Sequence, residues 1–255
     1  MKTLFHRIYS DYLMPSRLGS YERLLQAAAD QGYRQLSVRD FLRPTRAATR
    51  TLVHRHDIDS DVRTAAKMFA IEAKIGITAS YYFRLSTLDF GLMRDIEAYG
   101  SEASYHYEEA ASYAKAQRIR SASVLRSRFP LIREQFAHNL SHIESTLERK
   151  LTTVASHGDF ANRRLQVYNH ELLADPALRL RCGIVCETYD ADLLEKFDQY
   201  ISDRPYPQHF HPISPRTALG RFHSICLLTH PVQWETNWRE TTRCNVRRAA
   251  EGLAW

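Results

Sequence analysis

The sequence predicts an α/β protein in which a mostly parallel sheet closes into a barrel. Segments rich in β-branched and aromatic residues alternate with segments of helical periodicity along the 255 residues, and this alternation is typical of parallel sheets. About seven strand segments occur, and their number favours a barrel. No repeat, low-complexity tract or linker interrupts the pattern. We therefore expect a single domain made of an N-terminal helical segment (1–50), the barrel (51–235) and a C-terminal helix (236–255).

Strands are predicted where β-branched and aromatic residues cluster in short runs. These runs cover residues 51–59, 77–85, 101–107, 151–158, 182–189, 199–203 and 223–230. Helices are predicted from apolar residues three or four apart and from residues that mark helix ends. They cover residues 20–33, 60–76, 89–100, 130–150 and 237–250. Ser20 is expected to cap the first helix, and Gly32 and Gly76 to end the first and the second.

The helix at 130–150 has the clearest pattern. Its apolar residues recur every three or four positions, which places them on one face: Ile132, Phe136, Leu140, Ile143 and Leu147. No run of about 18 apolar residues occurs, so no membrane span is expected. The first residues lack an apolar segment of signal-peptide length, so we expect a cytoplasmic protein. The four cysteines are irregularly spaced and are expected to be free thiols.

The formal charge of +6 suggests anionic partners without identifying one. Basic residues are densest between Lys115 and Arg133. A solvated surface or loop accounts for such a run. A groove for a phosphate-bearing or acidic substrate is the alternative. No nucleic-acid-binding motif accompanies the run, so we expect no nucleic-acid partner.

Polar residues of catalytic type follow four of the predicted strands. Asp57 and Asp59 end the first, and the other three end in His106, His157 and His230. In a parallel barrel the carboxyl ends of the strands lie on one face, which carries the active site. One aspartate with two histidines is a common ligand set for zinc and similar divalent ions.

Asp57 and Asp59 are two residues apart, and this spacing directs both carboxylates to the same face of an extended chain. Two carboxylates repel each other unless a cation, a shared proton or solvent offsets their charge. A divalent ion would do so. An ion-pair network with Arg55 and Arg63 is the structural alternative.

The segments "RHDID", "EASYHYEE", "VASHGDF" and "LLTHPVQW" together resemble the polysaccharide deacetylase family, which is carbohydrate esterase family 4. The resemblance extends from about Tyr21 to Trp234 and is nearest to the branch of bacterial surface-glycan biosynthesis. It implies a distorted (β/α)7 barrel that holds one divalent ion between an aspartate and two histidines. Zn²⁺ is the expected ion, with Ni²⁺, Co²⁺, Mn²⁺ and Fe²⁺ as alternatives. The implied reaction removes an N-acetyl group from an amino sugar.

The resemblance assigns Asp57 as the general base and Asp59 as a metal ligand, although Ile58 separates them here and the reverse assignment stays open. His106 is the second ligand. The family's other histidine would stand four residues later, where this chain has Ala110. His157 is the expected replacement, and His56 is the second choice because strand alternation turns it away from Asp57.

His230 is the implied general acid. Substrate contacts are expected from polar residues after the strands, namely Arg84, Asn162, Arg163, Tyr189 and Asp203. The tryptophans Trp234 and Trp238 are expected to pack in the core, with an aromatic wall for a sugar ring as the alternative. The acetylated amino sugar could be joined to an anionic nucleotide or lipid carrier. Two other functions stay open: a glycan-binding protein without activity, and a hydrolase of another carbon–nitrogen bond, such as a deformylase.

Overall fold

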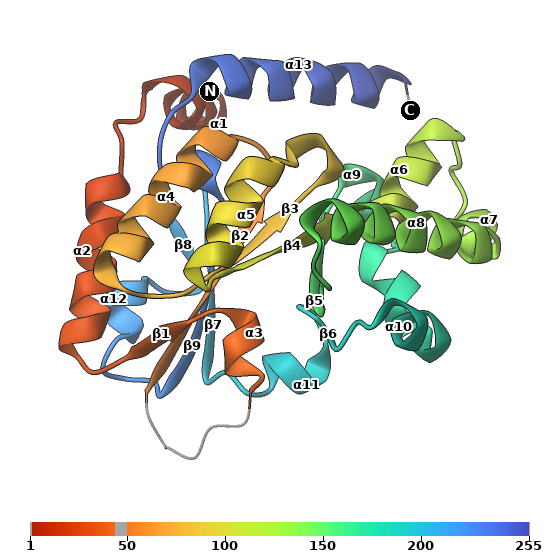
Figure 1. Cartoon of the computed structure of the whole chain (residues 1–255). Helices are drawn as coiled ribbons and strands as arrows, with labels where there is room; N and C mark the ends of the chain where they lie inside the picture. Colours follow the sequence, from red (N-terminus) through yellow and green to blue (C-terminus); the bar gives the residue numbers. More distant parts are fainter. Residues whose placement is uncertain (1, 44–49, 255) are drawn as a thin grey trace.

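The computed structural model describes residues 2–43 and 50–254 (Figure 1), and within them nine strands form one sheet. The strands are β1 (Arg34–Leu36), β2 (Thr51–Ile58), β3 (Ser80–Phe83), β4 (Glu102–Tyr107), β5 (Thr153–Ser156), β6 (Cys186–Glu187), β7 (Gln199–Asp203), β8 (Phe210–His211) and β9 (Ser224–Thr229). Every segment expected to be a strand contains one of them.

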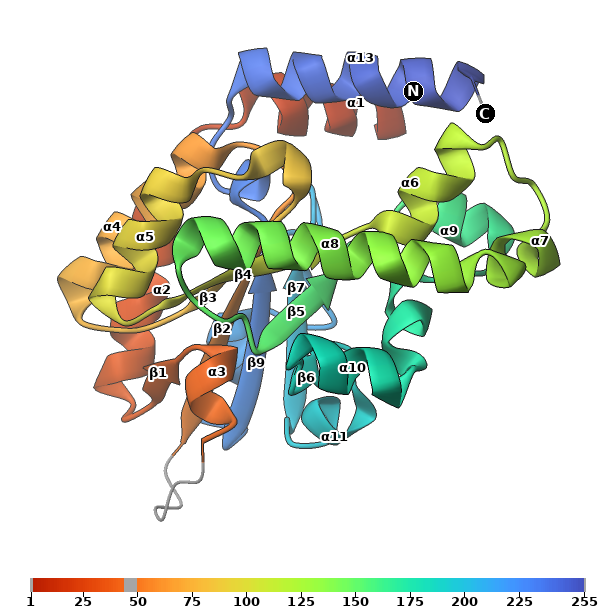
Figure 2. The same cartoon turned by 45° about the vertical axis from the view of Figure 1, so that its right-hand side comes forward.

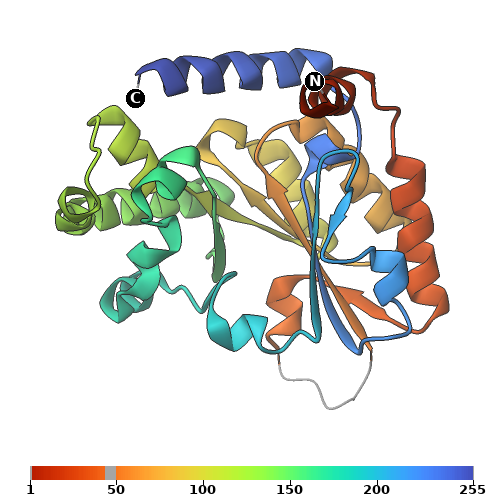
Figure 3. The same ribbon diagram turned by 180° about the vertical axis from the view of Figure 1, so that it is seen from behind.

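The strand order is β6-β5-β4-β3-β2-β9-β7-β8, and β1 lies beside the first half of β2. All neighbours are parallel except β7 and β8. The sheet curls into a half-barrel (Figures 1 and 3), and in the described part of the chain β6 and β8 are the strands at the two ends of this order. The expected α/β class and parallel sheet are confirmed, whereas the curled sheet is open between these strands.

Helices surround the sheet. They are α1 (Lys2–Ile8), α2 (Leu18–Asp30), α3 (Val38–Phe41), α4 (Val62–Ile75), α5 (Phe90–Tyr99), α6 (Glu109–Ala116), α7 (Ala122–Ser127), α8 (Phe129–Leu147), α9 (Phe160–Leu165), α10 (Pro176–Cys182), α11 (Ala191–Leu194), α12 (Pro215–Ala218) and α13 (Trp238–Ala254). Short irregular helices are η1 (Tyr9–Leu13), η2 (Leu85–Thr87), η3 (Asn169–Ala174) and η4 (Pro231–Gln233). Helix α13 contacts η1 and crosses above the sheet (Figure 2).

The sequence pattern predicts the long helices well. The five apolar residues expected on one face of α8 are all buried, and they pack in the largest apolar cluster. Helix α4 ends at Gly76, whose φ of +85° needs a residue without a Cβ atom. Trp234 packs in the core as expected, whereas Trp238 is exposed. None of the four cysteines forms a disulfide.

Several details differ from the expectations, and helices α6, α7, α9 and α10 lie outside the segments expected to be helical. Helix α2 begins at Leu18, so Ser20 lies inside the helix and does not cap it. The segment 1–50, expected to be helical, contributes β1, and its residues 44–49 lie outside the described part of the chain. Strand β8 was not expected. Strands of two or three residues are too short for a clear alternation of polar and apolar side chains.

Strand β2 carries polar side chains on both faces. His56 lies on the helix side, where its Nε2 is 2.8 Å from Glu72 Oε1 and its Nδ1 is 2.6 Å from Thr229 Oγ1. The hydroxyls of Tyr21 and Tyr81 donate to the same Glu72 carboxylate. His56 is therefore part of a buried network under the sheet and is not a candidate metal ligand.

Within the described residues, none of the helices combines the length and the apolar character that a membrane span requires.

Candidate metal centre

The carboxyl ends of six parallel strands meet below α13 and carry the candidate site. Asp59 follows β2, Arg84 follows β3, Glu108 follows β4 and His157 follows β5. Asp203 is the last residue of β7, and His230 follows β9. The convergence expected from a parallel sheet is thus present, and it joins residues up to 171 positions apart.

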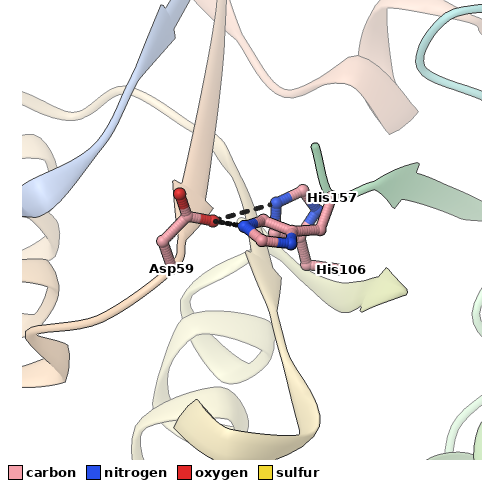
Figure 4. A group of neighbouring side chains, drawn as sticks. All are labelled: Asp59, His106 and His157. Carbon is pink, nitrogen blue, oxygen red and sulfur yellow. Dashed lines mark ion pairs between the residues drawn. The ribbon is translucent and has the colours of Figure 1, made fainter. Parts of the chain in front are cut away.

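Asp59, His106 and His157 point toward one another (Figure 4). Each offers one ligand atom, and these atoms lie within 4.8 Å of one another. The Oδ1 atom of Asp59 is 3.2 Å from His106 Nε2 and 3.4 Å from His157 Nε2. Ligand atoms bound to zinc at tetrahedral angles are about 3.3 Å apart. The separations of Asp59 from the two histidines therefore match those of zinc ligands, and the group could hold a divalent ion.

The hydrogen bonds of His106 give a second test of this fit. Its Nδ1 is 3.0 Å from the carbonyl oxygen of Ala155, and a carbonyl can only accept a hydrogen bond. Nδ1 therefore carries a proton, and in the neutral ring the lone pair of Nε2 faces the Asp59 carboxylate. Two acceptors at 3.2 Å repel each other unless a cation or a second proton lies between them. Metal-binding histidines commonly have such a carbonyl partner.

His157 is held between two carboxylates. Its Nδ1 is 3.4 Å from Glu108 Oε2, while its Nε2 faces Asp59. Burial would lower the pKa of His157, but the carboxylates of Asp59 and Glu108 raise it to about 9. Burial would raise the pKa of Asp59, but the imidazoles of His157 and His106 bring it well below its usual range. Both shifts show that this group favours positive charge at its centre.

Arg84 fixes the position of Glu108. Its guanidinium donates to both Glu108 oxygens at 3.1 and 2.6 Å, and it also reaches the carbonyl of Asp59 at 3.3 Å. Burial would raise the pKa of Glu108, but hydrogen bonding from His157 and the charge of Arg84 lower it to about 2. Arg84 is therefore a supporting residue for the histidine, and its expected contact with substrate stays a prediction.

Asp57 lies beside this group. Its Oδ2 is 3.5 Å from His106 Nε2, and both of its oxygens accept hydrogen bonds from Arg55 at 2.8 and 2.7 Å. Burial would raise the pKa of Asp57, but Arg55 and His106 lower it. The charge of Asp57 is thus offset by Arg55, as in the ion-pair alternative, whereas Arg63 is near Glu235 instead.

His230 is held by Asp203. The Nδ1 atom of His230 is 2.7 Å from Asp203 Oδ1, and its backbone N–H donates to Oδ2 at 2.7 Å. The indole N–H of Trp234 donates to the same Oδ2 at 3.1 Å. Burial would lower the pKa of His230, but Asp203, together with Asp59 and Asp57, raises it to about 9. Asp203 therefore positions His230, and its expected contact with substrate stays a prediction.

The other expected substrate contacts lie in different surroundings. Asn162 is buried, donates to the carbonyl of Val167 and accepts from the backbone N–H of Asp159, so it shapes the loop after β5. Arg163 is exposed and lines a cavity beside Asp59. The ring of Tyr189 lies 4.6 Å from the Arg55 guanidinium. A substrate contact for each of these residues stays a prediction.

Glu108 had no assigned role in the sequence-based prediction, and Arg55 was expected only as an ion-pair partner in the structural alternative. Arg55 lies two residues before Asp57 on β2, so both side chains fall on one face of the strand. Glu108 directly follows β4 and was visible as a strand-end carboxylate. Their positions in the sequence were therefore sufficient to predict that both side chains lie at the site.

A curled parallel sheet with two histidines and an aspartate at its strand ends defines an α/β protein with a candidate metal centre. Comparison of the chain with models of known protein families and with curated proteins found no match. We therefore base the functional proposal on the geometry of the site.

Proposed function

We propose that the protein is a metal-dependent hydrolase that removes an N-acetyl group from an amino sugar of a bacterial surface glycan or its precursor. In this proposal the curled sheet is a variant of the distorted (β/α)7 barrel of the polysaccharide deacetylase family. The resemblance of the strand-end segments to that family supports the choice of substrate. The open edges β6 and β8 are compatible with a distorted barrel.

The observation that carries the proposal is the group Asp59, His106 and His157, whose ligand atoms lie within 4.8 Å of one another. A divalent ion held there would supply a Lewis acid for an amide carbonyl and for the attacking water. Zn²⁺ is the proposed ion because it prefers nitrogen and carboxylate ligands in this number. Glu108 and Ala155 hold the two imidazoles in the orientation that this role requires.

Asp57 and His230 supply the proton transfers in this proposal. The low pKa of Asp57 keeps its carboxylate ionised, so it can accept a proton from water. The raised pKa of His230, about 9, keeps its imidazole protonated at neutral pH, so its Nε2 can donate a proton to the leaving nitrogen. Opposite pKa shifts of this kind favour one base and one acid in the same site.

Acetate release from N-acetylated amino sugars tests the proposal. We expect release with stoichiometric Zn²⁺ and its loss after chelation, with recovery when Zn²⁺ is returned. A parallel panel of N-formylated sugars separates a deacetylase from a deformylase. If the purified protein holds no metal and binds glycans without turnover, the protein is a glycan-binding relative without activity and the proposal fails.

A further inference from the structure

One cavity joins the candidate metal centre to α13. It has a volume of about 540 Å³, within the range of ligand-binding pockets, and Asp59 and His157 line one of its walls. Helix α13 lines the other. Its cavity-facing residues recur every three or four positions, as one face of a helix requires: Glu240, Arg243, Cys244, Arg247, Arg248 and Glu251. A molecule in this cavity can therefore touch both the metal ligands and α13.

Arginines dominate the walls away from the metal centre. Besides the three on α13, Arg163 and Arg164 of α9 line the cavity. The carboxylates there are already engaged, because Lys115 reaches Asp159 and Glu251 at 2.8 Å each.

Glu251 also accepts from Arg247 at 2.9 Å, and Glu240 is 3.5 Å from Arg243. Among the described residues, neither Arg163 nor Arg248 forms an ion pair with a carboxylate. Positive charge is therefore in excess on both sides of the cavity.

The basic run from Lys115 to Arg133 does not supply this charge. Arg126 pairs with Glu171, Arg133 pairs with Asp175, and Lys115 is used by the two carboxylates described above. These three residues are therefore engaged within the fold, and the arginines that line the cavity come from α9 and α13 instead.

We propose that Arg163 and Arg248 bind a phosphoryl group of the substrate while its acylated nitrogen lies at the metal centre. The choice of phosphoryl follows from the donor type, since guanidinium groups bind phosphate oxygens through paired hydrogen bonds. A phosphoryl group has several oxygens pointing in different directions, so it can accept hydrogen bonds from arginines on opposite walls of the cavity. The identity of the acylated sugar rests on the proposed function, but the anion site stands on the cavity alone.

Titration calorimetry with inorganic pyrophosphate tests the anion site without any need for turnover. The full-length protein is measured as purified and again with a chelator, so that contact between pyrophosphate and a metal does not contribute. We expect the double variant Arg163→Gln, Arg248→Gln to bind pyrophosphate about 10-fold more weakly or worse. The charge-matched control Arg216→Gln, Arg221→Gln changes two exposed arginines near α12 and should bind like the wild type.

No binding by the wild type at low salt, or equal weakening in the control, would overturn the anion site. A kinetic comparison then tests whether the anion belongs to the substrate. We expect a higher kcat/KM for an N-acetylated sugar phosphate than for the free sugar, and a loss of this preference in the Arg163, Arg248 double variant alone. Equal kcat/KM for both sugars in the wild type would overturn that assignment. Pyrophosphate binding without any acetate release would instead count against the proposed function and leave the anion site standing.

Discussion

The substitution Asp203→Asn tests whether the ion pair with His230 keeps the general acid protonated. Trp234 and the backbone of His230 both donate to Oδ2, so the amide oxygen of the asparagine takes that position. The amide nitrogen then faces His230 Nδ1 as a donor, which disfavours a proton there. The pKa of His230, raised to about 9 in the wild type, should fall to about 6.5, because Asp203 is the main group that opposes the effect of burial and only Asp59 and Asp57 then remain to do so.

The size of the effect follows from the two pKa values. At pH 8 a histidine of pKa about 9 is about nine-tenths protonated, and one of pKa about 6.5 is about 3% protonated. The variant should therefore lose about 30-fold in kcat at pH 8 and recover most of this loss near pH 5.5. The contribution of the Asp203–His230 ion pair to the free energy of unfolding should also depend on pH. The ion pair stabilises the fold fully below about pH 6.5, and its contribution is lost as the pH rises through about 9.

The pH profile of kcat for acetate release measures this shift. The control Asp192→Asn removes an exposed carboxylate on α11 and should leave the profile in place. If the alkaline limb of the Asp203→Asn variant stays at the wild-type pH, the ion pair does not govern the proton donor and the assigned role of His230 is wrong.

Four further substitutions separate the roles of the site residues. Asp57→Asn should keep the metal and lower kcat about 10²–10⁴-fold, whereas His106→Ala should lose metal and activity together; equal metal loss by elemental analysis would make Asp57 a ligand. Arg55→Met should leave the buried Asp57 carboxylate unpaired and lower the free energy of unfolding by about 3–5 kcal/mol, measured by urea denaturation; a loss below about 1 kcal/mol would contradict this pairing. Glu108→Gln should release His157 and weaken zinc binding about 10–100-fold in a chelator competition, and unchanged affinity would remove Glu108 from the site.

The sequence predicted the long elements of the fold because their patterns are local. The apolar face of α8 and the glycine that ends α4 are set by residues within one or two turns. Strands β1 and β8 were missed because their positions depend on partners elsewhere, namely β2 and β7. The openness of the sheet was missed for the same reason, since it depends on which edges meet.

The same distinction between local and distant contacts applies to the site. Asp59, His106 and His157 could be grouped from sequence because parallel strands present their carboxyl ends at one edge. The role of Asp203 could not be predicted from sequence, because it depends on contact with a histidine 27 residues later. The sequence also did not predict where α13 lies on the sheet, although it did predict that this segment is helical. Its docking depends on contacts with the N-terminal segment, such as that between Arg7 and Asn245.

The two polar faces of β2 restrict how this strand can align during folding. Arg55 and Asp57 face the site, while His56 faces Glu72 on the helix side. A slip of one residue would exchange the faces of these side chains and leave charges without partners in the interior on both sides of the sheet. In a strand with one apolar and one solvated face, a slip of one residue is unfavourable only on the buried face. In β2, misaligned pairing is disfavoured from both sides, and a single-residue insertion or deletion within 54–57 should not be tolerated.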